Sequence, residues 1–171
     1  MIKLVTPTID YKKSFLLGYT EFLKEGTFIE CNLEYINNFF PTFIEQIKDL
    51  GKRKFLNPFY IPETIYWLVD EKNKIFIGRV GIRHSLNKDY FNFKGHIGYA
   101  IVPSQRKNGY GNLILKLALE KAKLLTLNRV LLTCNSSNIP SKKIIEKNGG
   151  IFENYKVDFD GTLKLRYWIN I

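Results

Sequence analysis

The segment Gln105-Arg106-Lys107-Asn108-Gly109-Tyr110-Gly111 holds the residues whose types and spacing point most clearly to chemistry. Arg106, Gly109 and Gly111 give the spacing R-x-x-G-x-G between an apolar run, Ile97 to Val102, and a helical pattern that begins near Gly109. Glycines let a backbone turn tightly and approach a ligand, and the first N–H groups of a helix attract anions. The spacing therefore predicts a polyphosphate site, with a purely structural turn as the alternative.

Two familiar phosphate loops are excluded by the residues that follow. A Walker loop requires Gly-Lys-Ser or Gly-Lys-Thr after its first glycine and four spacers, and these residues are missing after Gly109. The dinucleotide fingerprint requires a third glycine three residues after Gly111, where Ile114 stands. A different anion-binding turn is therefore expected.

Three further segments surround the turn: the run from His96 to Ser104, the run from Thr133 to Ser141, and Ile145-Glu-Lys-Asn-Gly-Gly. Together with the turn they resemble the GNAT superfamily of N-acetyltransferases over about the last two-thirds of the chain. Pro62 to Asp70 and Gly78 to His84 are similar to a subgroup of predicted acetyltransferases. The resemblance implies an α/β fold, with a central twisted mixed β-sheet flanked by helices, in a single domain over residues 1–171.

The same resemblance implies a function. An acetyl group would move from acetyl-coenzyme A to a primary amine of a small molecule, peptide or protein, by direct attack in a ternary complex. The backbone amides of Arg106 to Gly111 would hold the pyrophosphate of the coenzyme. Asn138 fits an asparagine position of the family, as a second contact to the coenzyme. A non-catalytic module that binds or senses acyl-coenzyme A stays the alternative.

Acetyl transfer needs a base for the amine, a donor for the oxyanion and a proton for the leaving thiolate, and it requires no metal. The resemblance assigns the oxyanion donor to the backbone around Ile101 and Val102. For the base we predict His96, because it begins the central strand and an imidazole accepts a proton near neutral pH. Glu63 is the alternative base, acting through a water molecule, and His84 is a weaker candidate.

The proton donor is less clear, because many family members carry a tyrosine seven residues after the asparagine and this chain has Ile145 there. Ser141 resembles the serine of ribosomal-protein-type members and is predicted to donate to sulfur or to a bridging water. Helix capping explains both Asn138 and Ser141 equally well. Cys134 has no adjacent histidine and is predicted to be a buried thiol, and no metal site is expected.

Composition limits the classes of protein and of partner. The chain has 171 residues, 45% of them apolar, and a net charge of +10, which favours an anionic ligand. No apolar run approaches about 20 residues and no secretory pattern is present, so we expect a soluble cytoplasmic protein without a membrane partner. The basic cluster Lys52-Arg53-Lys54 lacks an aromatic RNA-binding signature, so nucleic-acid binding is not expected. The sequence leaves open whether the chain forms a homodimer.

Hydrophobic periodicity predicts the elements that must position these residues. A proline at position 41 predicts a kink or two shorter helices within the second helical pattern, and Asp160-Gly161 predicts a hairpin turn. An irregular connection is expected from Gly51 to Pro58 and a polar loop from His84 to Lys94. The predicted strands are Met1–Val5, Ile65–Val69, Ile75–Ile82, Ile97–Val102, Arg129–Thr133, Phe152–Val157 and Thr162–Ile169, and the predicted helices are Tyr11–Lys24, Leu33–Leu50, one from Gly109, and Pro140–Lys147.

Overall fold

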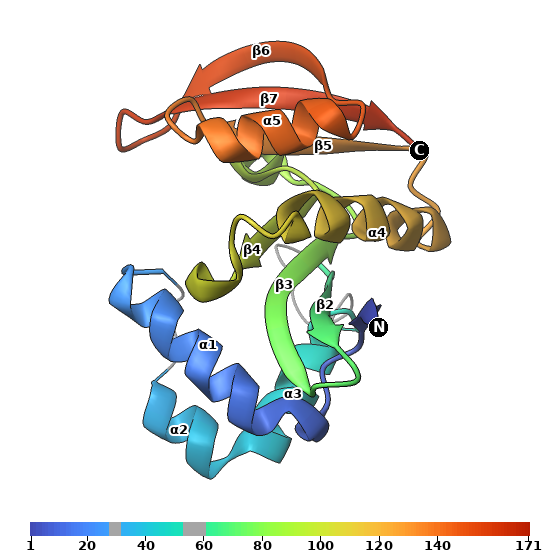
Figure 1. Cartoon of the computed structure of the whole chain (residues 1–171). Coiled ribbons are helices and arrows are strands. Elements are labelled where there is room, and N and C mark those ends of the chain that lie inside the picture. Colours follow the sequence, from blue (N-terminus) through green and yellow to red (C-terminus); the bar gives the residue numbers. More distant parts are fainter. Residues whose placement is uncertain (28–31, 53–60) are drawn as a thin grey trace.

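The computed structural model describes residues 1–27, 32–52 and 61–171, and Figure 1 shows the whole chain. Seven strands and five α-helices are present in the described residues, with short 3₁₀ or π-helical turns between them. In chain order the elements are β1 (Ile2–Val5), η1 (Ile9–Tyr11), α1 (Lys12–Lys24), α2 (Leu33–Asn38), α3 (Phe40–Asp49), β2 (Glu63–Asp70), β3 (Ile75–Arg83), the π-helical η3 (Tyr90–Lys94), β4 (Ile97–Ile101), η4 (Pro103–Gln105), α4 (Tyr110–Leu124), β5 (Arg129–Asn135), α5 (Ile139–Lys147), β6 (Ile151–Val157) and β7 (Leu163–Asn170).

The predicted helices and strands are confirmed, and one connection differs from its prediction. Pro41 stands in the first turn of α3, where its missing N–H is not needed, so the helical pattern divides into α2 and α3. Asn32 caps α2 by accepting hydrogen bonds from the N–H groups of Glu34 and Tyr35. The expected polar loop ends in the π-helical turn η3, which packs against β5.

The strands form two antiparallel sheets, in the orders β1-β2-β3-β4 and β5-β7-β6. The α/β fold class with helices around the sheets is confirmed, but the expected mixed sheet is divided between β4 and β5. These strands meet just before β4, where the N–H of His96 donates to the carbonyl of Leu131 over 2.7 Å. Gly95, with φ of 69°, permits this approach, because a Cβ there would lie 2.5 Å from the Leu131 oxygen.

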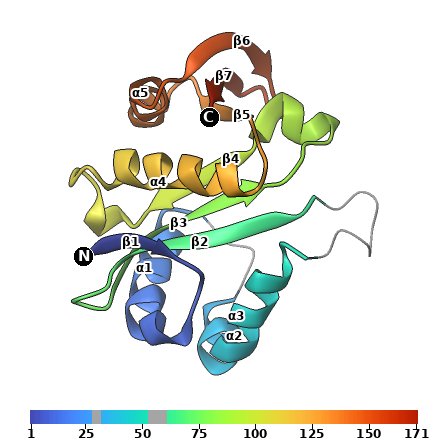
Figure 2. The same ribbon diagram turned by 90° about the vertical axis from the view of Figure 1, so that its right-hand side faces the viewer.

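Helices cover both faces of the four-stranded sheet, as Figure 2 shows. On one face α1 and α3 pack over an aromatic core that includes Phe15 and Trp67, whose rings stack at 4.6 Å. On the other face α4 packs with both sheets around an aliphatic core that includes Ile114 and Leu132. The start of α4 is therefore fixed beside the end of β4.

Some predictions concern residues that the structure does not describe. Cys31, Arg53, Lys54 and the Asn57-Pro58 pair lie outside the described residues. None of the helices in the described ranges has both the length and the apolar character that a membrane span requires.

Candidate functional site

The turn between η4 and α4 presents a row of backbone N–H groups. Lys107 and Gly109 adopt left-handed conformations, with φ of 66° and 78°, and α4 begins at Tyr110. On one side of this row the N–H of Arg106 donates to the Pro103 carbonyl over 3.2 Å, and on the other the N–H of Asn112 donates to the Gly109 carbonyl over 3.1 Å. From Lys107 to Gly111 the backbone N–H groups have no partner within the described part of the chain. Such a row at a helix N-terminus is suited to an anion.

The side chain of Arg106 lies toward α1. Its Nε donates to the Ile101 carbonyl over 3.1 Å, and its two terminal nitrogens donate to the Glu25 carboxylate over 2.8 and 2.7 Å. Lys107 and Asn108 are exposed, while Gly111 faces α5, where an added Cβ would lie 2.6 Å from the Cδ1 of Ile144. The anion site of this turn is therefore made by backbone, with Arg106 bound to neighbouring protein groups.

A cleft of about 330 Å³ opens between β4 and β5. Because β4 is an edge strand, alternate N–H groups point either to β3 or toward the cleft. The N–H of Val102 donates to the Ile77 carbonyl over 2.9 Å, so Tyr99 and Ile101, at odd positions, direct their N–H groups away from β3. The lining residues are Arg83, Lys94, Ile97, Gly98, Tyr99, Thr133, Cys134, Asn135, Asn138 and Ser141.

Three side chains that can donate a proton meet in this cleft. The hydroxyls of Tyr99 and Ser141 are 3.3 Å apart, and Cys134 is 7% exposed next to them. Burial raises the pKa of Tyr99 to about 12, although the hydrogen bond to Ser141 opposes this rise. Burial also raises the pKa of Cys134, so the thiol stays protonated at neutral pH, as the sequence predicts. Asn138 caps α5, accepting a hydrogen bond from the N–H of Ser141 over 3.1 Å.

His96 joins the two sheets. Its Nδ1 accepts a hydrogen bond from the N–H of Leu131 over 2.9 Å, which places the ring proton of the neutral imidazole on Nε2. The side chain is 8% exposed. Burial, followed by the positive charges of Arg83 and Arg129, lowers its pKa to about 4. In this arrangement the only unprotonated ring nitrogen is already bonded, so the geometry does not favour His96 as a base.

Glu63 lies beside the cleft, next to Arg83. The distance between Glu63 Oε1 and Arg83 Nη2 is 3.4 Å, and Arg83 also donates to the Gly95 carbonyl over 3.0 Å. The carboxylate occupies the space that a side chain at Gly81 would fill, and Gly98 is paired with Gly81 in the next strand. A Cβ at Gly98 would be 3.8 Å from the Arg83 guanidinium. The two glycines thus leave room over β3 and β4 for the Glu63 carboxylate and the Arg83 guanidinium.

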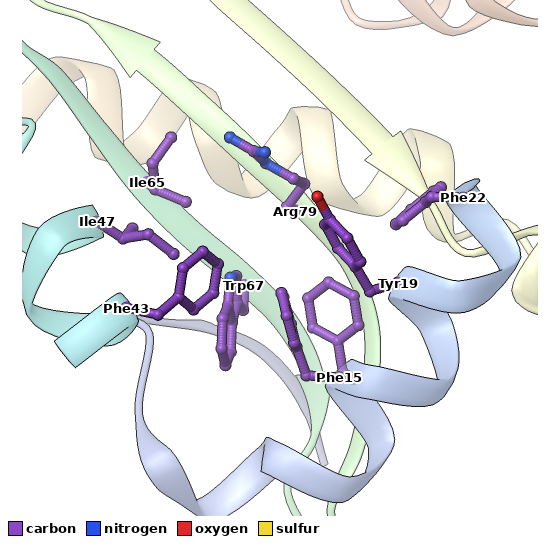
Figure 3. A pocket seen from close by; sticks show the side chains of 9 residues that line it. Phe15, Tyr19, Phe22, Phe43, Ile47, Ile65, Trp67 and Arg79 are labelled. Carbon is purple, nitrogen blue, oxygen red and sulfur yellow. The ribbon is translucent and has the colours of Figure 1, made fainter. Parts of the chain in front are cut away.

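A second, smaller pocket lies between the sheet and the helices α1 and α3. Figure 3 shows aromatic and aliphatic side chains that point toward one another, with Arg79 of β3 beside the ring of Tyr19. Its lining residues are Phe15, Tyr19, Phe22, Phe43, Ile47, Ile65, Trp67, Phe76 and Arg79. Glu63, Ile65 and Trp67 are alternate residues of β2, so their side chains lie on the same face of the sheet. The pocket and Glu63 therefore share one sheet face.

The structure brings together most of the residues that the sequence singles out, and it adds others. Glu63, Asn138 and Ser141 all border the β4–β5 region, whereas His84 binds the Thr64 hydroxyl over 2.7 Å. Sequence reasoning missed Tyr99 as a donor, which the alternation of β4 could have indicated. It also missed the contacts of Arg106 to α1, for which the sequence contains no local signal.

Comparisons with known proteins point to one family of sequences and one fold. Residues 25–151 match the sequence model of the acetyltransferase (GNAT) domain, whereas no curated protein sequence matches the chain significantly. The fold is similar to that of the microcin C7 self-immunity acetyltransferase MccE, whose structure contains acetyl-CoA and AMP (16% identity, 99% of this chain and 92% of that chain, TM-score 0.68). It is also similar to a putative ribosomal-protein-serine acetyltransferase from Vibrio cholerae (17%, 99% and 94%, 0.67). A third similar structure is a GNAT-family acetyltransferase from Bacillus anthracis (16%, 99% and 94%, 0.68).

Proposed function

The chain belongs to the GNAT family of acetyltransferases, whose acetyl donor is acetyl-coenzyme A, and we propose that it acetylates a primary amine by direct attack in a ternary complex. The observation that carries this proposal is the row of N–H groups from Lys107 to Gly111, unpartnered in the described part of the chain, which lies between the end of β4 and the first turn of α4. Residues 1–171 act as one domain in this proposal, because the loop, both sheets and α1 all contribute to the site.

Backbone groups provide most of the contacts proposed for the coenzyme. The N–H groups of Lys107, Asn108, Gly109, Tyr110 and Gly111 hold the pyrophosphate, and the positive end of the α4 dipole adds to the attraction. The free edge of β4 receives the arm that carries the thioester. The N–H groups of Tyr99 and Ile101 point away from β3 at the free edge of β4, so they are the proposed donors to the oxyanion, in place of the N–H of Val102, which is bonded within the sheet.

Glu63 is the proposed base, acting through a water molecule. Its carboxylate lies over Gly81 and is about one quarter exposed, at 23%, so water can reach it. The pairing with Arg83 fixes the position of the carboxylate at the side of the cleft. His96 is the less favoured base, because its unprotonated ring nitrogen, Nδ1, already accepts a hydrogen bond from the Leu131 N–H.

Tyr99 and Ser141 are the proposed donors to the leaving sulfur. Because a phenol with a pKa of about 12 is a weaker acid than a thiol, Tyr99 stabilises the thiolate by a hydrogen bond rather than by complete proton transfer. Ser141, bonded to Tyr99, can relay a proton from solvent. Tyr99 thus takes the place of the tyrosine that the family carries where this chain has Ile145.

The direct test is a screen for release of free thiol from acetyl-coenzyme A. Purified protein is incubated with amino acids, polyamines, aminoglycosides and peptides, and thiol release is compared with the rate without an acceptor. Release above that rate with at least one amine supports the enzyme. Tight binding of coenzyme A without any release would support a binding or sensing module instead.

A further inference from the structure

Two carboxylates near the end of α1 bind the loop that precedes α4. Glu21 accepts hydrogen bonds from both the N–H and the hydroxyl of Ser104, each over 2.8 Å. Glu25, one turn later, accepts hydrogen bonds from both terminal nitrogens of Arg106 over 2.8 and 2.7 Å. Figure 1 shows this end of α1 next to the segment between β4 and α4. The two contacts join residues that are more than 80 positions apart in the sequence.

The placement of these carboxylates is unfavourable for α1 on its own. Negative charges near a helix C-terminus oppose the helix dipole, and like charges at positions i and i+4 repel each other. Two carboxylates beside an anion site also repel the anion. A role in local helix stability therefore does not explain them, whereas the four hydrogen bonds to the loop do.

We propose that Glu21 and Glu25 are positioning residues that hold the 103–109 loop in the conformation that binds the coenzyme pyrophosphate. Glu21 fixes the start of the loop through Ser104, and Glu25 fixes its middle through Arg106. Arg106 is held from its other side by the Ile101 carbonyl, over 3.1 Å. Its role is to shape the backbone, and the N–H groups contact the phosphates. This inference rests on the proposed function, because it assumes that coenzyme A binds at this loop.

The direction in which one substitution changes the affinity for coenzyme A separates this role from direct phosphate binding by Arg106. If Arg106 contacted the phosphates, Glu25 would compete for it, and Glu25→Gln would tighten coenzyme A binding. If Glu25 positions the loop, Glu25→Gln weakens binding although it removes a negative charge. An exposed bidentate pair is worth at most a few-fold, so we expect about fivefold weaker binding from Glu25→Gln and about tenfold from Glu21→Gln and Glu25→Gln together.

The experiment is calorimetric titration of coenzyme A into wild-type protein and the single variants Glu21→Gln, Glu25→Gln and Arg106→Gln. Two double variants, Glu21→Gln/Glu25→Gln and Glu25→Gln/Arg106→Gln, are titrated in the same way. Glu120→Gln is the matched control, since Glu120 is an exposed carboxylate on α4 that pairs with Lys123, at 3.5 Å. This control removes the same charge as the test substitutions do, but at a position about 15 Å along α4 from the start of that helix, at 1.5 Å per residue. We expect the control to change the dissociation constant by less than about twofold because salt screens distant surface charges.

The double variant tests whether Glu25 and Arg106 act as one unit. We expect it to bind about as weakly as the weaker single variant, because either change breaks the same contact. With a substrate amine in hand, the variants should raise the KM for acetyl-coenzyme A and leave kcat nearly unchanged. Thermal unfolding of each variant shows whether a general loss of stability is present, which would lower the apparent kcat by reducing the folded fraction and would leave KM nearly unchanged.

Three results would overturn the inference. Tighter or unchanged coenzyme A binding by Glu25→Gln, when wild type binds, rejects the positioning role and leaves the proposed function intact. Fully additive effects in the double variant show that Arg106 acts independently of Glu25. Absence of coenzyme A binding by the wild-type protein overturns the proposed function itself, and the inference with it.

Discussion

Gly109→Ala should weaken coenzyme A binding through backbone strain alone. Gly109 has φ of 78°, and nothing lies within 4 Å of an added Cβ, so alanine meets no clash there. The left-handed conformation costs a residue with a Cβ about 1–2 kcal/mol. The exposed loop can relax away from this conformation in the free protein, but the N–H groups from Lys107 to Gly111 then no longer converge. Coenzyme A must restore the strained conformation, which raises its dissociation constant about 5- to 30-fold.

Gly161→Ala is the matched control for this prediction. Gly161 has φ of 82° and nothing within 4 Å of an added Cβ, so the strain is the same, but it lies in the turn between β6 and β7. Calorimetric titration with coenzyme A should show near wild-type affinity for this variant, and chemical denaturation should show that both variants are folded. Equal affinities of the two alanine variants would refute the reasoning that the backbone N–H groups of Lys107 to Gly111 hold the pyrophosphate.

Three further predictions concern the residues around the cleft. Glu63→Gln should lower kcat/KM about 100-fold, the low end for a positioned base, with coenzyme A affinity nearly unchanged; a kcat/KM close to that of wild type points to another base. The pKa of His96, lowered to about 4 by burial, means that the unfolded state takes up a proton first as pH falls. The free energy of unfolding should therefore decrease between about pH 6.5 and 4, by up to about 3 kcal/mol. The free energy of unfolding of His96→Asn, measured by chemical denaturation, should depend less steeply on pH; equal slopes for the two proteins would reject this. Tyr99→Phe and Ser141→Ala should each slow single-turnover acetyl transfer, with coenzyme A affinity nearly unchanged, and full rates in both would leave solvent as the only donor.

The sequence predicts the elements well because each carries a local signal. Pro41 divides two helices, the Asp160-Gly161 pair turns a hairpin, and Gly109 begins α4, and all three effects act through neighbouring residues. The division of the sheet was not predictable from periodicity. It depends on contacts of Gly95 and His96 with Leu131, more than thirty positions away, and no local pattern encodes that distance.

The site was predictable in its backbone and much less in its side chains. R-x-x-G-x-G specifies turn geometry, so the loop could be placed from sequence, and Ser141 followed from its position after Asn138. The partners of these residues were not accessible in the same way. Whether Arg106 faces an anion or Glu25 depends on where α1 packs, and whether His96 is a base depends on the Leu131 N–H that occupies its ring nitrogen.

The backbone amides of Lys107 to Gly111 can be observed directly by NMR, in isotopically labelled protein titrated with coenzyme A. If these groups hold the pyrophosphate, their amide proton signals should shift strongly toward lower field as hydrogen bonds form, while those of the Gly161 turn stay in place. Saturating coenzyme A that leaves the amide signals of Lys107 to Gly111 unchanged would contradict the account.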